Sequence, residues 1–468
     1  RLRLWLPELG ICLLVLFFAL RELGEFPAAW ADDSLFMIVA RNIAEGDGYV
    51  LRILDHVWPY PYILGVGPTL ILPSALAIKF LGFSIEAARL PQVGFLLATA
   101  LIFYVSANRT AGRTSARWST LLLVTLSAFV NTGKPVLGEI PGFFFLLLGL
   151  FVLQRGEKTA WHAVIAGIAF GLAVLTKLTY GLLYPALGIA GLVALLRKDG
   201  RGFSLLFLTG TVALAVFLPW RLLEASREGG LGKDFLFLWG QSRDAAAAPF
   251  AHILSNPRIL LRLPFLSFVV FLVLGALGLR QRWRSLPESF FLVASSLIVL
   301  FTLYFFSSFG WYRHLLPAHL LLLLFVPMGT EKLFTRCPAM LFLATVAALQ
   351  GFWQFGHLGA SGSTEAAEAA TAIQRDLKEH DLIIQQAEVF TRLPKNPRWL
   401  FLTSPKLSER LPTTYTEKTP AQKCMLTLRK FREEERTELK YQIVPLAGRY
   451  ALLLPPTSCG PRTTDNNR

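Results

Sequence analysis

The chain has 468 residues, of which 54% are hydrophobic and 16% are charged, and its formal net charge is +15 at pH 7. Apolar runs of about 20 residues, the length that crosses a bilayer, recur along it and predict a polytopic, all-α membrane protein. The positive charge does not indicate nucleic-acid binding, because the sequence has no basic stripe with interleaved aromatic residues and no nucleic-acid-binding motif. Lysine and arginine collect in the cytoplasmic loops of membrane proteins, and this accounts for the charge.

About eleven apolar segments are predicted to be transmembrane helices. The first has no small-residue cleavage site, so we expect it to be an uncleaved anchor. The segments cover residues 6–23, 88–106, 118–133, 140–153, 161–177, 180–196, 203–220, 264–279, 287–306, 314–330 and 338–354.

A further apolar stretch, residues 62–83, decides the topology. It is interrupted by Gly65, Gly67, Pro68 and Pro73, and such backbone is tolerated at membrane depth where it is buried in protein or lines a cavity. If it does not cross, every second loop is basic, as the positive-inside rule requires; if it crosses, the rule fails for the loops after the first. We therefore predict a juxtamembrane or re-entrant element. The basic loop residues are Arg1, Arg3, Arg109, Arg113, Arg117, Arg155, Lys158, Arg197, Lys198, Arg201, Arg280, Arg282, Arg284, Lys332 and Arg336.

This topology places four segments on the non-cytoplasmic side and predicts two domains. A transmembrane domain is expected at residues 1–356 and a soluble extracytoplasmic α/β domain at residues 357–468. The outer segments are a long first loop with juxtamembrane helices at residues 24–87, loops near 134–139 and 221–263, and the tail from 357.

The tail has the composition of a small soluble domain. Residues 363–386 predict a helix followed by a short strand, and residues 441–456 predict two strands about a glycine turn. About 100 residues is a reasonable size for an independent unit. Cys424 and Cys459 lie here, and an oxidising compartment permits a disulfide between them, although the sequence leaves the pairing open. The cysteines show no zinc-site spacing.

Two adjacent carboxylates, Asp32 and Asp33, follow the first apolar segment. One interpretation is helix capping, because the stretch starts with an acid, has an Arg41–Glu45 pair four residues apart and ends at Gly46. One aspartate is enough to cap, and successive helical residues point about 100° apart, so the second carboxylate faces elsewhere. Carboxylates that face a site in or near the membrane are usually functional.

Two charged residues precede and begin the fourth apolar segment, on the same predicted side. Glu139 is either an ordinary interfacial charge or part of a site, and Lys134 lies close by in the sequence. Lys177 ends the fifth segment on this side, where it either anchors the helix or pairs with a phosphate group.

A late stretch combines Trp311 with Tyr312, Arg313 and His314. It is either an aromatic belt with a snorkelling cation or a phosphate site, since arginine makes bidentate charge-assisted bonds to phosphate. The remaining histidines have no metal-site spacing, and no P-loop, GxSxG or HExxH motif occurs in a suitable context.

Together these features resemble the GT-C superfamily of membrane glycosyltransferases, which includes protein O-mannosyltransferases and the aminoarabinose transferases of lipid A. WADDSLFMIVARNIAEGDGY is similar to the family's Asp-Asp or Asp-Glu motif with the following helix and N-x-x-x-G-x-G. GVGPTLILPSALAIKFLGFSIEAARLPQ resembles its proline-containing juxtamembrane segment, GEIPGFFFLLLGL its second acidic loop, and WYRHLLPAHL its late Arg-Tyr-x-x-Pro element. The departures are the Asp-Asp pair, Gly67-Pro68 in place of Lys-Pro-Pro, and His314 after Arg313; they leave the sugar and the acceptor open.

The resemblance implies an inverting transferase in the inner (plasma) membrane, with its active site on the periplasmic side. A sugar would move from a polyprenyl-phosphate-linked donor to a hydroxyl of an envelope lipid, glycan or protein. Asp32 would be the general base and Asp33 would orient the acceptor or the base. Cations would offset the charge that develops on the phosphate, and attack from the opposite face would invert the anomeric centre. The donor-phosphate residues are expected to be Arg313, His314, Tyr312, Lys177 and Lys134.

The role of Glu139 and the need for a metal stay open at this point. Glu139 would bind the acceptor, or it would hold a divalent ion together with Asp32 and Asp33. The main alternative function is a transporter or flippase of a lipid-linked or anionic substrate, which predicts charges near the midplane of the spans and repeated halves. An inactive scaffold subunit is a further alternative, against which the intact aspartate pair argues.

Overall fold

The computed structural model divides into two compact units. The first, which we call the helical unit, comprises residues 1–23, 62–73 and 89–360, and the second, the mixed unit, comprises residues 24–61, 74–88 and 361–468. The structure describes residues 5–156, 159–228, 263–308, 310–357, 364–403, 417–430 and 442–454.

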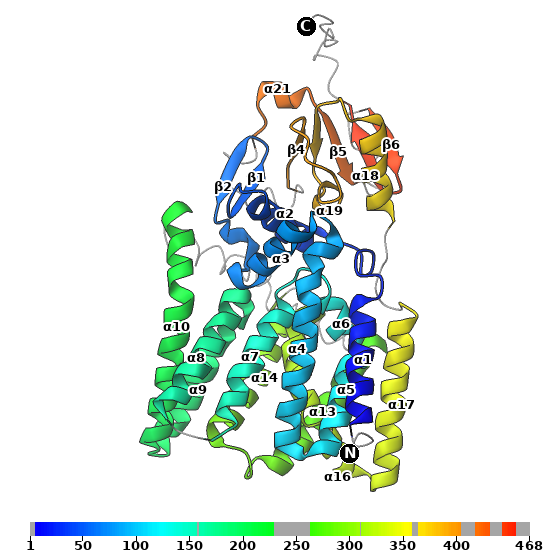
Figure 1. Cartoon of the computed structure of the whole chain (residues 1–468). Coiled ribbons are helices and arrows are strands. Elements are labelled where there is room, and N and C mark those ends of the chain that lie inside the picture. The colour runs from blue at the N-terminus through cyan, green and yellow to red at the C-terminus, as the bar shows by residue number, and fades with distance from the viewer. Residues whose placement is uncertain are drawn as a thin grey trace, which may run out of the picture. The chain divides into compact units, whose positions relative to one another are not determined.

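The helical unit is a bundle of apolar helices (Figure 1). Two of its helices, α3 and α4, have residues in both units. Its elements are α1 (Leu6–Leu20), the short 3₁₀ helix η2 (Tyr62–Leu64), α3 (Pro68–Leu81), α4 (Ile85–Ala111), α5 (Arg113–Thr125), α6 (Ser127–Gly133), α7 (Glu139–Leu153), α8 (Ala160–Thr176), η3 (Leu178–Leu182), α9 (Leu183–Leu196), α10 (Gly200–Glu228), α13 (Leu263–Arg282), α14 (Glu288–Ser307), α15 (Tyr312–Leu323), α16 (Val326–Leu333) and α17 (Arg336–Phe355).

Each predicted apolar segment is helical in the structure, but two of them are broken. The segment at residues 118–133 is divided at Leu126 into α5 and α6, and the segment at 314–330 is divided into α15 and α16, which meet at a bend of 59°. The stretch at 62–83 becomes η2 and α3, with Pro73 inside the helix. Apolar composition therefore predicts helix correctly here, whereas it does not predict where a helix breaks.

The predicted number of spans is not confirmed. Among the described residues, five helices are long and apolar enough to cross a membrane, and the bent pair α15–α16 makes up to six. Four other apolar helices have 10–17 residues, namely α1, α3, α7 and α8. Large apolar side chains are exposed on several helices, for example Leu341, Leu349 and Phe352 on α17 at 68%, 64% and 70%, as expected where a helix faces lipid.

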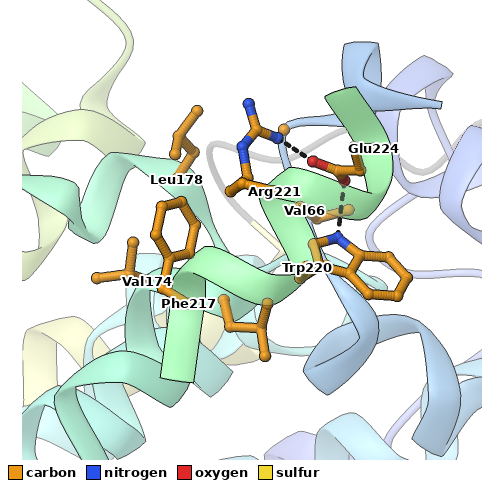
Figure 2. Close-up of a pocket in the computed structure, with 10 residues that line it drawn as sticks. Val66, Val174, Leu178, Phe217, Trp220, Arg221 and Glu224 are labelled. Atoms are coloured by element: carbon orange, nitrogen blue, oxygen red, sulfur yellow. Dashed lines mark hydrogen bonds and ion pairs between the residues drawn. The ribbon is translucent and has the colours of Figure 1, made fainter. Parts of the chain in front are cut away.

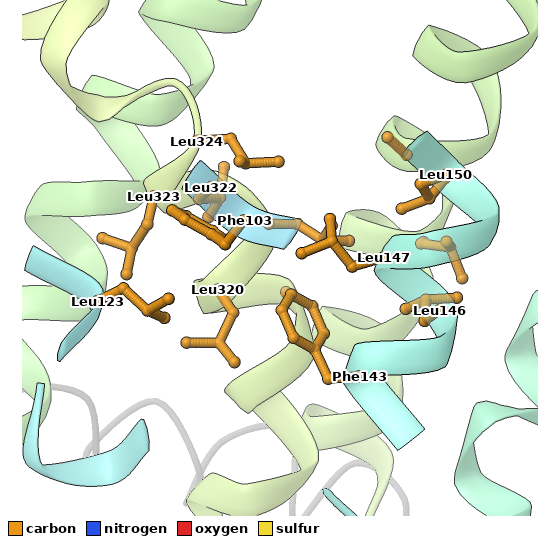
Figure 3. Packing of buried hydrophobic residues seen from close by; sticks show 14 of the residues in the cluster. Phe103, Leu123, Phe143, Leu146, Leu147, Leu150, Leu320, Leu322, Leu323 and Leu324 are labelled. Carbon is orange, nitrogen blue, oxygen red and sulfur yellow. The ribbon is translucent and has the colours of Figure 1, made fainter. Parts of the chain in front are cut away.

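The core of the helical unit is a continuous cluster of leucine and phenylalanine side chains. Figure 3 shows Phe103 of α4, Leu123 of α5, Phe143 of α7 and Leu320 of α15 gathered in one region, and all four are fully buried. Because lipid tails are as apolar as leucine, close packing rather than exclusion of water holds such helices together. Gly329 of α16 illustrates this, since a Cβ atom there would collide with a backbone carbonyl oxygen of α13.

The mixed unit contains a five-stranded sheet in the order β4-β3-β5-β7-β6. Strand β3 lies between β4 and β5 and pairs in parallel with both, while β7 pairs antiparallel with β5 and β6. All three residues of β3 are fully buried, as is usual for a strand covered on both faces. The elements of the tail are α18 (Glu365–Asp376), β3 (Leu382–Ile384), α19 (Ala387–Phe390), β4 (Trp399–Phe401), α21 (Pro420–Lys423), β5 (Leu426–Lys430), β6 (Ile443–Ala447) and β7 (Tyr450–Leu453).

The helix and strands predicted in the tail are confirmed. In α18 the residues Ala366, Ala369, Ala370 and Ile373 form a buried stripe at helical spacing, and β6 and β7 are joined by a turn at Gly448, whose φ is +50°. Cys424 is disulfide-bonded, whereas Cys459, its suggested partner, lies outside the described residues.

The first outer loop contributes a helix and a hairpin to the mixed unit. These are α2 (Ala31–Ala44) and the antiparallel pair β1 (Val50–Ile53) and β2 (His56–Pro59). The amide of Leu54 donates to the carbonyl of Phe401 at 2.7 Å, and Arg41 donates to the carbonyl of Leu393 at 2.9 Å. Residues 24–61 thus belong to the same compact unit as the tail, whereas the predicted domain boundary groups them with the transmembrane helices.

Candidate active site

The two adjacent aspartates at the start of α2 have different environments. The backbone amide of Trp30 donates to Asp33 Oδ1 at 2.8 Å, which makes Asp33 part of the helix cap. Asp33 is fully buried, while Asp32 beside it is half-buried. Capping therefore accounts for the position of Asp33.

The residues that follow hold α2 against the hairpin. Asn42 Nδ2 donates to the carbonyl of Val50 at 2.9 Å, and Arg41 and Glu45 form the predicted ion pair at 2.7 Å. The chain leaves the helix through Gly46, whose φ of +91° favours glycine. The motif N-x-x-x-G-x-G thus fixes the orientation of the helix that carries the aspartates.

A buried carboxylate at the start of α7 brings together two predicted cations in the helical unit. Lys177 Nζ donates to Glu139 Oε1, and Arg313 Nε lies 3.8 Å from the same oxygen. Tyr180 donates its hydroxyl to the Glu139 backbone carbonyl. Glu139 is 3% exposed. We call Glu139, Lys177 and Arg313 the cation cluster; with one negative and two positive groups, it has a net positive charge.

The position of Lys177 is set by backbone pairing with the segment before α3. Lys177 has extended φ and ψ angles of −151° and 128°, and it forms an isolated antiparallel bridge with Val66. The amide of Leu178 donates to the carbonyl of Gly65 at 3.0 Å. A Cβ atom at Gly67 would collide with the carbonyl oxygen of Leu175. Glycine is therefore required at Gly67 by the close approach of two backbones, a reason that the sequence alone does not show.

The side chains of residues 311–314, at the start of α15, have different partners. Arg313, which belongs to the cation cluster, lies over the ring of Trp311, at 4.2 Å from its centroid. His314 Nδ1 is 2.8 Å from the hydroxyl of Ser308, and the hydroxyl of Tyr312 pairs with the buried His319. Of the three predicted phosphate ligands in this stretch, Arg313 is thus the one in contact with Glu139.

Lys134 has a separate environment. Its ammonium group donates to the backbone carbonyl of Arg21, and the residue is 1% exposed. Burial, together with the nearby guanidinium of Arg89, lowers the pKa of Lys134 to about 8. These contacts tie the loop after α6 to the end of α1.

A second buried charged group, on α10, lies outside the predicted site residues. Arg221 and Glu224 on α10 form an ion pair, and Trp220 Nε1 donates to Glu224 at 2.7 Å (Figure 2). The sequence signal was available, since an acid and a base three residues apart follow the apolar run that ends at residue 220. The predicted transmembrane segment ends at residue 220, so both charged residues fall in the predicted outer loop at 221–263, whereas α10 continues to Glu228.

The described residues do not contain a group of three or more His, Cys, Asp or Glu side chains that would hold a metal ion. At Glu139 the ammonium group of Lys177 already supplies a cation. The alternative that Glu139 holds a divalent ion together with Asp32 and Asp33 stays a prediction.

The fold is similar to those of two solved proteins, ArnT and AglB. ArnT from Cupriavidus metallidurans bound to undecaprenyl phosphate superposes with a TM-score of 0.66 at 13% identity, over 97% of this chain and 98% of that protein; its apo form gives 0.67 at 14% identity, over the same shares. The archaeal oligosaccharyltransferase AglB from Archaeoglobus fulgidus, in complex with an inhibitory peptide and a dolichol-phosphate, gives 0.57 at 11% identity, over 85% of this chain and 64% of that one.

At the level of sequence, residues 67–222 match the dolichyl-phosphate-mannose-protein mannosyltransferase family. No curated protein matches the chain significantly. The resemblance seen in the sequence is thus matched by a family model over residues 67–222, and the structural likeness extends over 97% of the chain.

Proposed function

We propose that the protein is an inverting glycosyltransferase that moves a sugar from a polyprenyl-phosphate-linked donor to a hydroxyl of a cell-envelope lipid, glycan or protein. The observation that carries this proposal is the likeness over 97% of the chain to ArnT, a protein solved with undecaprenyl phosphate. The match of residues 67–222 to a dolichyl-phosphate-mannose family supports the same class of donor, because undecaprenyl and dolichyl phosphates are both polyprenyl phosphates.

The cation cluster is the proposed site for the donor phosphate. Its net positive charge suits an anion, and Lys177 and Arg313 are 12% and 14% exposed in their side chains, so a ligand at the surface reaches them with little rearrangement. Arginine binds phosphate through two parallel hydrogen bonds, while lysine acts as a point charge. Both would offset the charge that develops on the departing phosphate, which is usually the largest catalytic effect of this kind.

Glu139 has a positioning role in this proposal. Its carboxylate holds the two cations in the absence of ligand, and it remains a candidate for binding the acceptor. Tyr312, His314 and Lys134 stay predictions as further donor-phosphate residues; their observed contacts with His319, Ser308 and Arg21 do not test that role.

Asp32 is the proposed general base. It would take the proton of the acceptor hydroxyl as that oxygen bonds to the anomeric carbon, and the bond from the anomeric carbon to the phosphate oxygen would break. One displacement from the opposite face inverts the anomeric centre. Asp33 would orient Asp32, and its bond to the amide of Trp30 supports that assignment by fixing the start of the helix.

The proposed location is the inner membrane, with about eleven crossings and the active site on the periplasmic side. The support for this orientation is the basic character of every second loop. Cysteine labelling at solvent-exposed positions tests it: Thr114→Cys should be modified only from the cytoplasm, and Lys79→Cys only from outside. Modification of Thr114→Cys from outside would overturn the orientation.

The test of function is sugar transfer by the purified protein in liposomes. Radiolabelled polyprenyl-phosphate sugars are supplied with envelope lipids and glycans, and wild type is compared with Asp32→Asn and Asp33→Asn. Loss of a general base typically costs about 10²–10⁴ in rate. Asp47→Asn is the matched control, because Asp47 lies after the same helix and pairs with Lys395 and Arg52. Undiminished transfer by Asp32→Asn would sink the assignment of the base.

A further inference from the structure

Two arginines from separate loops lie beside one aromatic ring in the helical unit. Arg109 is near the end of α4 and Arg155 follows α7, and their Cζ atoms are 5.9 Å and 5.7 Å from the ring centroid of Phe151. Both arginines are exposed, and Phe151 is half-buried. In the part of the chain that the structure describes, neither arginine forms an ion pair with a carboxylate. We call Arg109 and Arg155 the arginine pair.

Two neighbouring arginines, by contrast, have a carboxylate partner. Arg113 Nε donates to Glu8 Oε1 at 2.7 Å, and Arg117 donates to both oxygens of Glu8, at 2.9 Å and 3.1 Å. An aromatic ring attracts a cation through its quadrupole but carries no net charge, so Phe151 does not offset the repulsion within the arginine pair. An anion that contacts both guanidinium groups would offset it, and both side chains are long and exposed enough to reach a common ligand.

The loops that carry the arginine pair are basic overall. Residues 108–114 contain two arginines and no acid, and residues 154–160 contain two basic residues and one acid. Basic groups remain in excess even after Glu8 is counted, so this surface attracts a negatively charged ligand.

Two exposed tryptophans indicate that this surface lies at the depth of the lipid headgroups. Trp5 is 59% exposed, and its ring centroid is 4.3 Å from the guanidinium carbon of Arg113. Trp161 is 69% exposed and lies in the first turn of α8, after the loop that contains Arg155. Tryptophan collects at membrane interfaces, because its ring is apolar while its N–H can bond to water or to a headgroup.

An apolar strip continues from the arginine pair along α4 and α7, which lie side by side in the helical unit (Figure 1). The two helices meet at both ends of the strip, because the rings of Phe95 and Phe144 have centroids 5.9 Å apart and Arg109 lies over Phe151. Residues three or four positions apart share one face of a helix. The partly exposed apolar residues at this spacing are Ile102 and Val105 on α4 and Phe144, Leu148 and Phe151 on α7. An acyl chain is as apolar as leucine and packs against such a strip.

We propose that the arginine pair and the apolar strip bind one anionic phospholipid, with its phosphate between Arg109 and Arg155 and an acyl chain along α4 and α7. Arginine binds phosphate through two parallel hydrogen bonds, and basic sites between transmembrane helices bind anionic headgroups. The cation cluster lies at the first residue of α7, Glu139, whereas the arginine pair lies at the other end of this helix. The lipid site is thus separate from the proposed donor site and does not depend on the proposed function.

The test measures lipid binding by the full-length protein in a neutral detergent at about 0.15 M salt, where long-range attraction is screened. Native mass spectrometry counts bound phosphatidylglycerol and phosphatidylcholine. We expect wild type to bind the anionic phosphatidylglycerol at least about tenfold more tightly than the zwitterionic phosphatidylcholine, because one hydrogen bond to a charged group contributes that much. The double variant Arg109→Gln/Arg155→Gln should lose this difference. Both positions are exposed, so its unfolding temperature without lipid should match that of wild type.

Two further variants separate a specific site from general attraction. Arg201→Gln/Arg336→Gln is the matched control, because it removes the same charge from exposed positions on the same predicted side, and we expect it to retain the preference. Arg109→Lys/Arg155→Lys keeps the charge but not the paired hydrogen bonds, so its affinity should be intermediate. A phosphatidylglycerol with a photoreactive acyl chain should label the peptides that contain Val105 and Leu148.

Several results would overturn the lipid site. The first two are equal binding of both lipids by wild type and an unchanged preference in Arg109→Gln/Arg155→Gln. An equal loss in Arg201→Gln/Arg336→Gln would show that charge alone attracts the lipid. Labelling that avoids both α4 and α7, or displacement of the lipid by an equal concentration of inorganic phosphate, would contradict the role of the apolar strip.

Discussion

Substitutions of Glu139 and Lys177 should change the affinity for a lipid phosphate in opposite directions, although the two residues form one ion pair. Removing Glu139 by Glu139→Gln takes away a carboxylate that competes with the ligand for Lys177 and Arg313. Removing Lys177 by Lys177→Met takes away a cation that the ligand needs. If the ion pair had only a structural role, both variants would weaken the binding of the lipid phosphate, each in proportion to its loss of stability.

The magnitudes follow from burial and distance. Two unit charges about 4 Å apart interact by about 4 kcal/mol at an effective dielectric constant of 20, and Arg313 Nε lies 3.8 Å from Glu139 Oε1. Breaking a buried pair on one side typically destabilises a protein by about 3–5 kcal/mol, so both variants should unfold at lower temperature than wild type. A hydrogen bond to a charged group contributes about 1.5–3 kcal/mol, which corresponds to a change of roughly 10- to 100-fold in affinity.

The assay combines thermal unfolding in detergent with titration of bare undecaprenyl phosphate. We expect Glu139→Gln to bind this lipid at least as tightly as wild type and Lys177→Met to bind it about tenfold or more weakly. Glu288→Gln is the matched control, because Glu288 pairs with Arg197 at 2.6 Å on the surface, where such a pair contributes about 0–1 kcal/mol. Equal weakening by Glu139→Gln and Lys177→Met would refute the assignment of the cation cluster to phosphate.

Three further predictions concern the surroundings of the site. Asp33→Asn should lower the unfolding temperature more than Asp32→Asn does, since Asp33 caps α2 and the loss of a cap costs about 1 kcal/mol; a larger loss for Asp32→Asn in calorimetry contradicts the assignment of the cap to Asp33. Gly67→Ala should abolish sugar transfer while the protein remains in the membrane, because its Cβ would push the Leu175 backbone away; a fully active variant disproves the close approach. Because the pKa of Lys134 is lowered from 10.5 to about 8, the unfolded chain binds this proton more tightly; the unfolding temperature should therefore rise between pH 8 and 10.5, and Lys134→Met should flatten that rise.

Local patterns in the sequence were sufficient for the elements themselves. Apolar runs identified the helices of the bundle, an acid before an apolar helix and Gly46 after it marked the limits of α2, and the alternation around Gly448 predicted β6 and β7. These features depend on residues within one or two turns of each other, so a single sequence contains them. The family motifs were recognisable for the same reason, since each is a short local arrangement.

The tertiary structure alone decided which residues meet. Glu139 and Lys177 are 38 positions apart, and Lys177 reaches Glu139 because the backbone of Val66 fixes its extended conformation. The division of the 314–330 segment at a bend of 59° and the addition of residues 24–61 to the unit of the tail likewise depend on packing between distant segments. Side-chain spacing along one helix does not specify such contacts, because they depend on how closely the surfaces of different helices pack against each other.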